Sequence, residues 1–130
     1  ISLVGCSGEP KVKVETKEIQ VAVIDQDRIW TESKRAEVYQ EDLNQEVNKI
    51  QQQYKGELDG LSEEEQVKEH QKAYQKINNL RKESRGQFKE EIKEVVKKFA
   101  QEKGFDVVLN KENVKYGGND ITDEVIEKLK

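Results

Sequence analysis

The chain has 130 residues, of which 33% are hydrophobic and 38% are charged, and its formal net charge is −4 at pH 7. This composition excludes a compact monomeric core of normal size, which leaves disorder or elongated helices completed by association. Sustained helical periodicity argues against disorder. The acidic balance gives no general electrostatic reason to bind nucleic acid or an anionic membrane surface.

The N-terminal segment is apolar and is followed abruptly by polar residues. Within it, Leu3-Val4-Gly5-Cys6 resembles a bacterial lipobox, in which the cysteine is lipidated and becomes the mature N-terminus. We interpret residues 1–5 as the remnant of a signal peptide and Cys6 as the lipidation site; the alternative is a stray unpaired thiol. Residues 6–18 then form the lipidated N-terminus and a polar tether, which could reach about 40 Å when extended. The chain contains no apolar run long enough to span a bilayer.

The first element after the tether is a predicted strand. Ile19–Ile24 alternates in polarity, and both of its faces are partly apolar. Asp25–Trp30 follows, and we expect a helical turn there that brings Trp30 into the core. Thr31 or Ser33 is placed to cap the long helix that begins next.

The longest feature of the sequence is a proline-free, highly charged stretch from Ser33 to Lys103. It predicts two antiparallel helices joined at a tight turn. Gly60 can adopt the left-handed conformation that follows a helix end. Ser62 and Glu65 have the spacing of a capping box, in which each side chain bonds a free backbone N–H of the second helix.

The two predicted arms carry opposite charge. Glu41–Glu69 holds nine acidic and three basic residues, whereas Lys72–Lys89 holds six basic residues and one acidic residue. Opposite signs favour antiparallel pairing, although each exposed contact contributes only about 0.2–1 kcal/mol. The apolar face of the second arm is diluted between Gln71 and Gln87 by serine, glycine and many cations.

The C-terminal part reads as strand, strand and helix. We predict strands at Phe105–Leu109 and Val114–Tyr116, and a short helix within Asp120–Lys130 that Thr122 can cap. Trp30 and Tyr116 are assigned to the core. Three strands are few for an independent sheet, and sharing strands between chains would solve this.

From about Ile19 to Lys130 the chain resembles the Skp/OmpH family of periplasmic chaperones. The resemblance is carried by the charged hairpin and by four short segments, which are Val21-Ala-Val-Ile-Asp25-x-x-Arg28-Ile-Trp30, Gly104-Phe-Asp-Val-Val-Leu109, Val114-x-Tyr116 and Asp120-Ile-Thr-Asp-Glu-Val125.

This resemblance implies an α+β fold, in which a long antiparallel helical hairpin stands on a small β-body shared between the chains of a homotrimer. The body would comprise residues 19–32 and 104–130, and the hairpin residues 33–103. It also implies an ATP-independent holdase that keeps unfolded outer-membrane proteins in a cage. Two departures from the family are the acidic charge, for which we carry over no lipopolysaccharide site, and the lipobox, which predicts a tethered chaperone. Ser7 lacks the acidic character typical of inner-membrane retention, which favours the outer membrane.

The sequence contains no catalytic constellation, metal-ligand cluster or cofactor motif, and its single histidine, His70, reads as a surface residue. We read Asp25, Asp27 and Arg28 as structural. The candidate client-binding residues are the apolar residues of the arms, which are Tyr39, Val47, Ile50, Tyr54, Leu58, Leu61, Val67, Tyr74, Ile77 and Leu80. The simpler alternative is that these residues only hold the two arms together. At the level of function, the alternative to a chaperone is a lipid-anchored coiled-coil spacer of the cell envelope.

Overall fold

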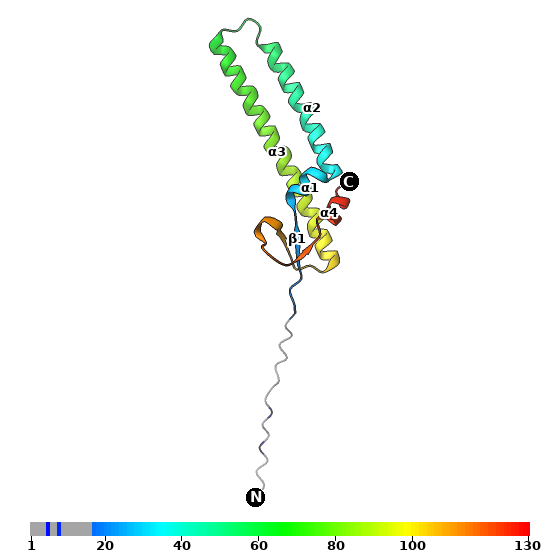
Figure 1. Cartoon of the computed structure of the whole chain (residues 1–130). Coiled ribbons are helices and arrows are strands. Elements are labelled where there is room, and N and C mark those ends of the chain that lie inside the picture. The colour runs from blue at the N-terminus through cyan, green and yellow to red at the C-terminus, as the bar shows by residue number, and fades with distance from the viewer. Residues whose placement is uncertain (1–4, 6–7, 9–16) are drawn as a thin grey trace.

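Two long helices, α2 (Lys34–Glu57) and α3 (Glu63–Lys103), form an antiparallel hairpin that rises from a small body (Figure 1). The computed structural model describes Gly5, Gly8 and residues 17–130, so Cys6 and most of the predicted tether lie outside the described residues.

The helix ends follow the chemistry that the sequence predicts. The Ser33 hydroxyl accepts a hydrogen bond from the Ala36 backbone N–H at 3.1 Å and so caps α2. At the tip, Gly60 has φ +82°, and Ser62 and Glu65 form the reciprocal capping box that begins α3. The predicted hairpin turn is therefore confirmed.

The body contains a three-stranded sheet in the order β2-β1-β3. Its strands are β1 (Val21–Ile24), β2 (Val107–Asn110) and β3 (Asn119–Asp120), and both outer strands run parallel to β1. Parallel neighbours require a crossover connection. Here the whole helical hairpin, together with the short helix α1 (Gln26–Glu32), serves as the crossover from β1 to β2.

The predicted strand at Val114–Tyr116 is wrong. The segment lies in the loop between the 3-10 helix η1 (Lys111–Asn113) and β3, and Tyr116 is 98% exposed rather than part of the core. The physical reason is topological, because the chain must travel from β2 at one edge of β1 to β3 at the other edge. Tertiary context therefore overrides the β-propensity of valine and tyrosine.

The start of α4 (Thr122–Lys128) also differs from the prediction, because Thr122 does not cap it. Ile121 occupies the N-cap position without a side-chain hydrogen bond, and Asp120 before it accepts hydrogen bonds from both the backbone N–H and the hydroxyl of Thr122. These two bonds, the hydroxyl bond first, lower the pKa of the Asp120 carboxyl. The buried Thr122 hydroxyl in turn accepts from the Asp25 N–H at 2.9 Å, which ties α4 to the end of β1.

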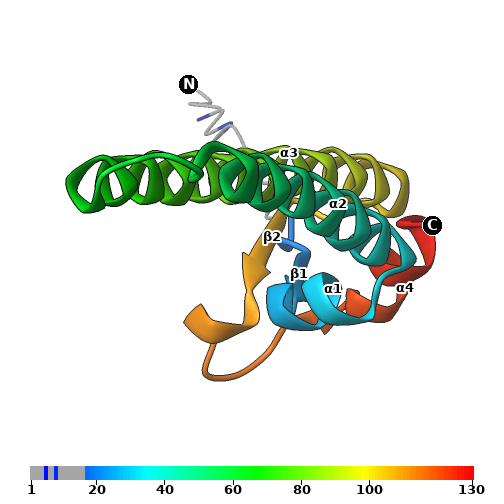
Figure 2. The ribbon, with the colours of Figure 1, turned by 90° about the horizontal axis from the view of Figure 1, so that it is seen from above.

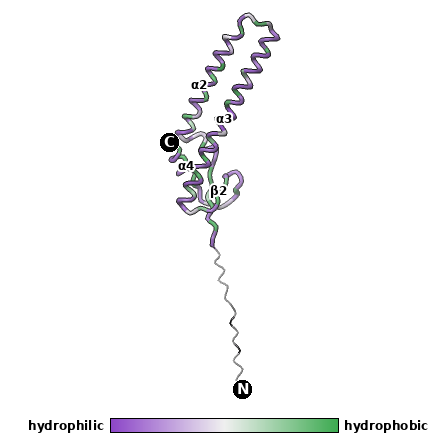
Figure 3. The backbone as a smooth tube through the Cα atoms, turned by 180° about the vertical axis from the view of Figure 1, so that it is seen from behind, coloured by the Kyte–Doolittle hydropathy of each residue, from purple (hydrophilic) through white to green (hydrophobic). Residues whose placement is uncertain are grey.

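The core lies between the inner face of the sheet, the short helices and the C-terminal half of α3. Figure 2 shows the sheet, α1 and α4 on the same side of α3. Four buried residues at helical spacing line α3 there, which are Phe88, Ile92, Val96 and Phe99. They pack with Ala22 and Ile24 of β1 and with Val125 of α4. The distal part of the hairpin lies outside this core and is predominantly hydrophilic (Figure 3).

Candidate functional site

The apolar contact surface between α2 and α3, called the seam below, is narrow and only partly buried. Most of the apolar residues that the sequence marked along it are half-buried, which are Tyr39, Val47, Ile50, Tyr54, Leu58, Leu61, Ile77 and Leu80. In a hairpin of two helices the opposite arm supplies this cover. The Tyr54 and His70 side chains meet across the seam, with 3.2 Å between the phenolic oxygen and Nδ1. His70 itself is exposed, as the sequence predicts.

Two of the marked residues are mainly exposed. Val67 is 57% exposed and Tyr74 is 62% exposed, and both belong to α3. They are seven residues apart, which places them two turns apart on one side of the helix. Val38 on α2 is a further exposed apolar residue that the sequence did not single out. The arms therefore present isolated apolar side chains on an otherwise polar surface.

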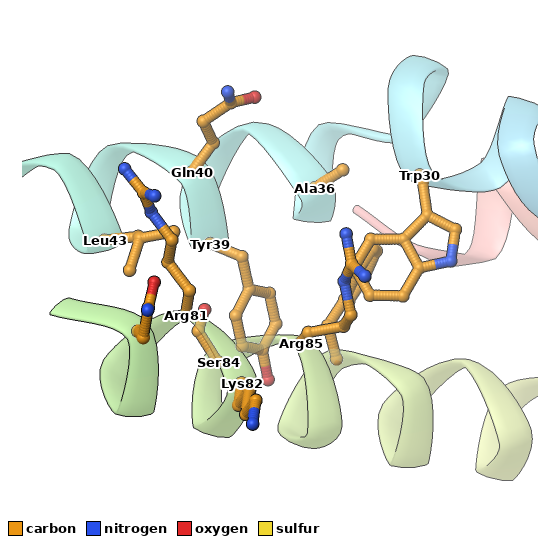
Figure 4. A pocket seen from close by; sticks show the side chains of 11 residues that line it. Trp30, Ala36, Tyr39, Gln40, Leu43, Arg81, Lys82, Ser84 and Arg85 are labelled. Atoms are coloured by element: carbon orange, nitrogen blue, oxygen red, sulfur yellow. The ribbon is translucent and has the colours of Figure 1, made fainter. Parts of the chain in front are cut away.

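A pocket of about 440 Å³ lies between the arms where the hairpin meets the body (Figure 4). Its apolar lining comes from α1, α2 and α3 and includes Trp30, Tyr39, Leu43 and Phe88. Phe88 anchors this wall, because it is 1% exposed and contacts both other aromatic rings. Its centroid lies 4.8 Å from that of Trp30, edge to face, and 4.9 Å from that of Tyr39.

The charged residues that line this pocket are all cations, namely Arg81, Lys82 and Arg85. Arg85 places its guanidinium carbon 5.7 Å from the centroid of the Trp30 ring. Burial raises the pKa of the Tyr39 phenol further above neutral pH, so this part of the wall is uncharged. The pocket therefore combines an aromatic wall with a cationic rim.

Among the described residues, charge complementarity does not produce an ion pair between α2 and the basic segment Lys72–Lys89 of α3. Among the residues that the structure describes, one ion pair joins α2 to α3, between Arg35 Nε and Glu91 Oε1 at 2.8 Å, and it lies close to the body. The other hairpin pairs, Lys49–Glu46 and Lys72–Glu69, each stay within one helix. Opposite charge between the arms thus acts only at longer range.

Asp25 and Arg28 make structural contacts, whereas Asp27 is exposed on α1. Asp25 caps α1 by accepting from the Arg28 N–H at 3.2 Å. The Arg28 guanidinium bonds Glu32 at 2.9 Å and Asp123 at 2.7 Å, so it links α1 to α4. Both carboxylates, Glu32 first, raise the pKa of Arg28, which keeps it cationic.

A protein-family model described as "Outer membrane protein (OmpH-like)" matches residues 60–129, which is more than half of the chain. The chain belongs to the OmpH-like family. The OmpH-like family is associated with periplasmic chaperones that bind outer-membrane proteins, and its members are not enzymes. The matched residues run from the hairpin tip through α3 to the end of the body, which is the part that contains the pocket's cations.

Comparison with curated proteins finds no match. None of the helices in the described ranges is long and apolar enough to cross a bilayer. Within the same ranges, no three histidine, cysteine or acidic side chains are grouped as a metal site would need.

Sequence reasoning missed the pocket, although one signal for it was available. In this OmpH-like chain the α3 side of the pocket is lined by Asn78, Ser84 and the three cations. This is the stretch in which polar residues dilute the apolar face of the second arm. A local loss of apolar residues on one arm leaves the large side chains of the other arm without full cover, and this is where a cavity forms.

Proposed function

We propose that this chain is an ATP-independent holdase chaperone that binds unfolded outer-membrane or other envelope proteins in a trimeric cage. The observation that carries the proposal is the exposure of Val67 and Tyr74 on a highly charged hairpin of the OmpH-like family. Separate apolar contacts on a polar surface give weak, repeated binding, which suits a client without fixed structure. No nucleic acid or nucleotide has a role in this mechanism.

The body supports assembly into a trimer that shares its β-structure. Val21 and Val23 of β1 share one face with their partners in β2, Val107 and Leu109, because paired residues of parallel strands point the same way. Val107 is 40% exposed and Leu109 is 41% exposed, so this second face of the sheet is incompletely covered within one chain. Burying it against two further copies would complete a core that one chain is too polar to build.

An aggregation assay tests the holdase. Wild-type protein whose mass by sedimentation equilibrium is about three times 15.1 kDa should suppress light scattering by an unfolded β-barrel protein. In the double variant Val67→Ser/Tyr74→Ser, we expect half-suppression to need roughly tenfold more chaperone, since about 1.4 kcal/mol of apolar contact is lost.

Two polar neighbours on α3 provide the matched control. Gln66→Ser/Gln75→Ser changes the same number of residues on the exposed surface of the same helix and should protect like the wild type. A wild-type trimer that leaves scattering unchanged would contradict the holdase and favour the envelope spacer.

We further propose that Cys6 carries a lipid that tethers the chaperone to a membrane on the periplasmic side, with the outer membrane favoured. Two or three acyl chains give stable anchoring where one is marginal. Cys6→Ser in the precursor should therefore move the protein from the membrane fraction to the soluble fraction without loss of client protection. Ser7→Ala is the control and should stay in the membrane fraction. Retention of the Cys6 variant in high salt would show that lipidation is not the anchor.

A further inference from the structure

We propose that the pocket at the base of the hairpin binds an aromatic or large aliphatic side chain of a client whose neighbouring residues carry carboxylates. This inference rests on the proposed holdase function and assigns a sequence preference to one part of its surface. It concerns the pocket of Trp30, Tyr39, Phe88, Arg81, Lys82 and Arg85, which is separate from the exposed Val67 and Tyr74 on the distal part of α3.

The pocket has the size and the rigid wall that a single large side chain requires. Its volume of about 440 Å³ falls in the range of about 300–1,000 Å³ typical of pockets that bury a small ligand. Phe88 is buried and held by two neighbouring rings, so the apolar wall is fixed before binding. A preformed apolar wall favours one large flat side chain, which gains contact area without an ordering cost on the protein side.

The rim of the pocket is positively charged. Arg81, Lys82 and Arg85 line the pocket without a carboxylate among the lining residues. None of the three forms an ion pair with a carboxylate in the described part of the chain. Figure 4 shows Arg81 extending from α3 toward α2, while Arg85 lies beside Trp30. A carboxylate next to the bound side chain would supply the charge-assisted hydrogen bonds that these cations lack.

The rim belongs to a basic stretch of an acidic chain. The chain as a whole carries a formal charge of −4, whereas Lys72–Lys89, the stretch of α3 that supplies the rim, holds six basic residues and one acidic residue. The cationic rim therefore marks the place where an acidic segment is favoured. A segment with lysine beside its aromatic residue would meet like charge at the same place, which is the basis of discrimination.

Trp30 makes the proposal directly measurable. It is the single tryptophan of the chain and it lines the pocket, so its fluorescence reports occupancy. The probe is an acetylated and amidated tripeptide of aspartate, phenylalanine and aspartate, titrated into the full assembled protein. We expect a saturable change in tryptophan emission. Two comparison tripeptides, with lysine for both aspartates or with alanine for phenylalanine, should bind at least tenfold more weakly.

Two double variants distinguish the effect of the rim cations on probe binding from the effect of other cations on α3. Arg81→Gln/Lys82→Gln removes two rim cations without touching the pair of Arg85 and Trp30, and should weaken the acidic probe at least tenfold. Lys93→Gln/Lys97→Gln removes two exposed cations of the same helix outside this pocket and should bind like the wild type. All four residues are exposed, and far-ultraviolet circular dichroism checks that both variants retain their helices.

The outcomes are distinct. Unchanged emission with the acidic probe would overturn the proposal and would be the result if a second copy of the chain fills the pocket. Equal binding of the lysine probe, or undiminished binding by the rim variant, would also overturn it. Protein that suppresses client aggregation but ignores the probe contradicts this pocket proposal alone. Protein that binds the probe but fails to suppress aggregation contradicts the holdase alone.

Discussion

Replacing Phe88 with alanine should lower the free energy of unfolding by about 3–5 kcal/mol, the range for removal of a buried phenylalanine. Phe88 is 1% exposed and contacts both Trp30 and Tyr39, so its loss opens a cavity between the body and both arms. The two remaining rings are held by different helices and cannot easily close that space. Urea unfolding followed by circular dichroism, at one fixed protein concentration, measures the change.

Two variants control this experiment. Tyr74→Ala removes an aromatic side chain of the same helix that is 62% exposed, and should change stability by no more than about 0.5 kcal/mol. Phe88→Leu keeps most of the buried volume and should recover more than half of the loss. If Phe88→Ala and Tyr74→Ala have equal effects, Phe88 does not anchor the junction.

Gly118→Ala should destabilise the body by roughly 2–5 kcal/mol. Gly118 has φ +85°, and a Cβ atom there would lie 2.5 Å from Cγ2 of Val23. A left-handed conformation costs an alanine about 1–2 kcal/mol, and overpacking costs about 1–3 kcal/mol more. Val23 cannot easily turn away, because its branched side chain is stiff and 5% exposed within the central strand.

The adjacent glycine isolates the steric contribution. Gly117 has φ +90°, but a Cβ atom there would meet no atom within 4 Å. Gly117→Ala should therefore cost only about 1–2 kcal/mol, through the backbone conformation alone. The difference between the two unfolding free energies measures the contact with Val23. Equal losses would show that the loop moves away from β1 without cost.

The hairpin could be predicted from the sequence because local chemistry determines it. Gly60, Ser62 and Glu65 specify the turn within six residues, and the apolar spacing of the first arm specifies which side of the helix meets its partner. The strands were less predictable. Val114–Tyr116 has the composition of a strand, yet the parallel order β2-β1-β3 uses that segment as a connection.

The candidate site, too, could be predicted only in part from the sequence. Periodicity identified the apolar residues of the arms but could not tell which of them the opposite helix covers, so Val67 and Tyr74 look no different in sequence from Ile77. Trp30 and Arg85 are 55 residues apart along the chain, and their contact depends on how the body meets the hairpin. A contact between residues so far apart along the chain produces no local sequence pattern that would predict it.

The use of the hairpin as a crossover couples the two parts of the molecule through chain entropy. Gln20 donates to Asp106 across 86 residues, and closing a flexible loop of that length costs about 4 kcal/mol. Once α2 and α3 are paired, the two ends of this loop are already close. Only the short segments between the hairpin and the strands must still be ordered. Pairing of the helices thus shortens the flexible part of the loop and lowers the entropy cost of closing it. A change that separates the arms would weaken the sheet as well, although it touches none of the strands.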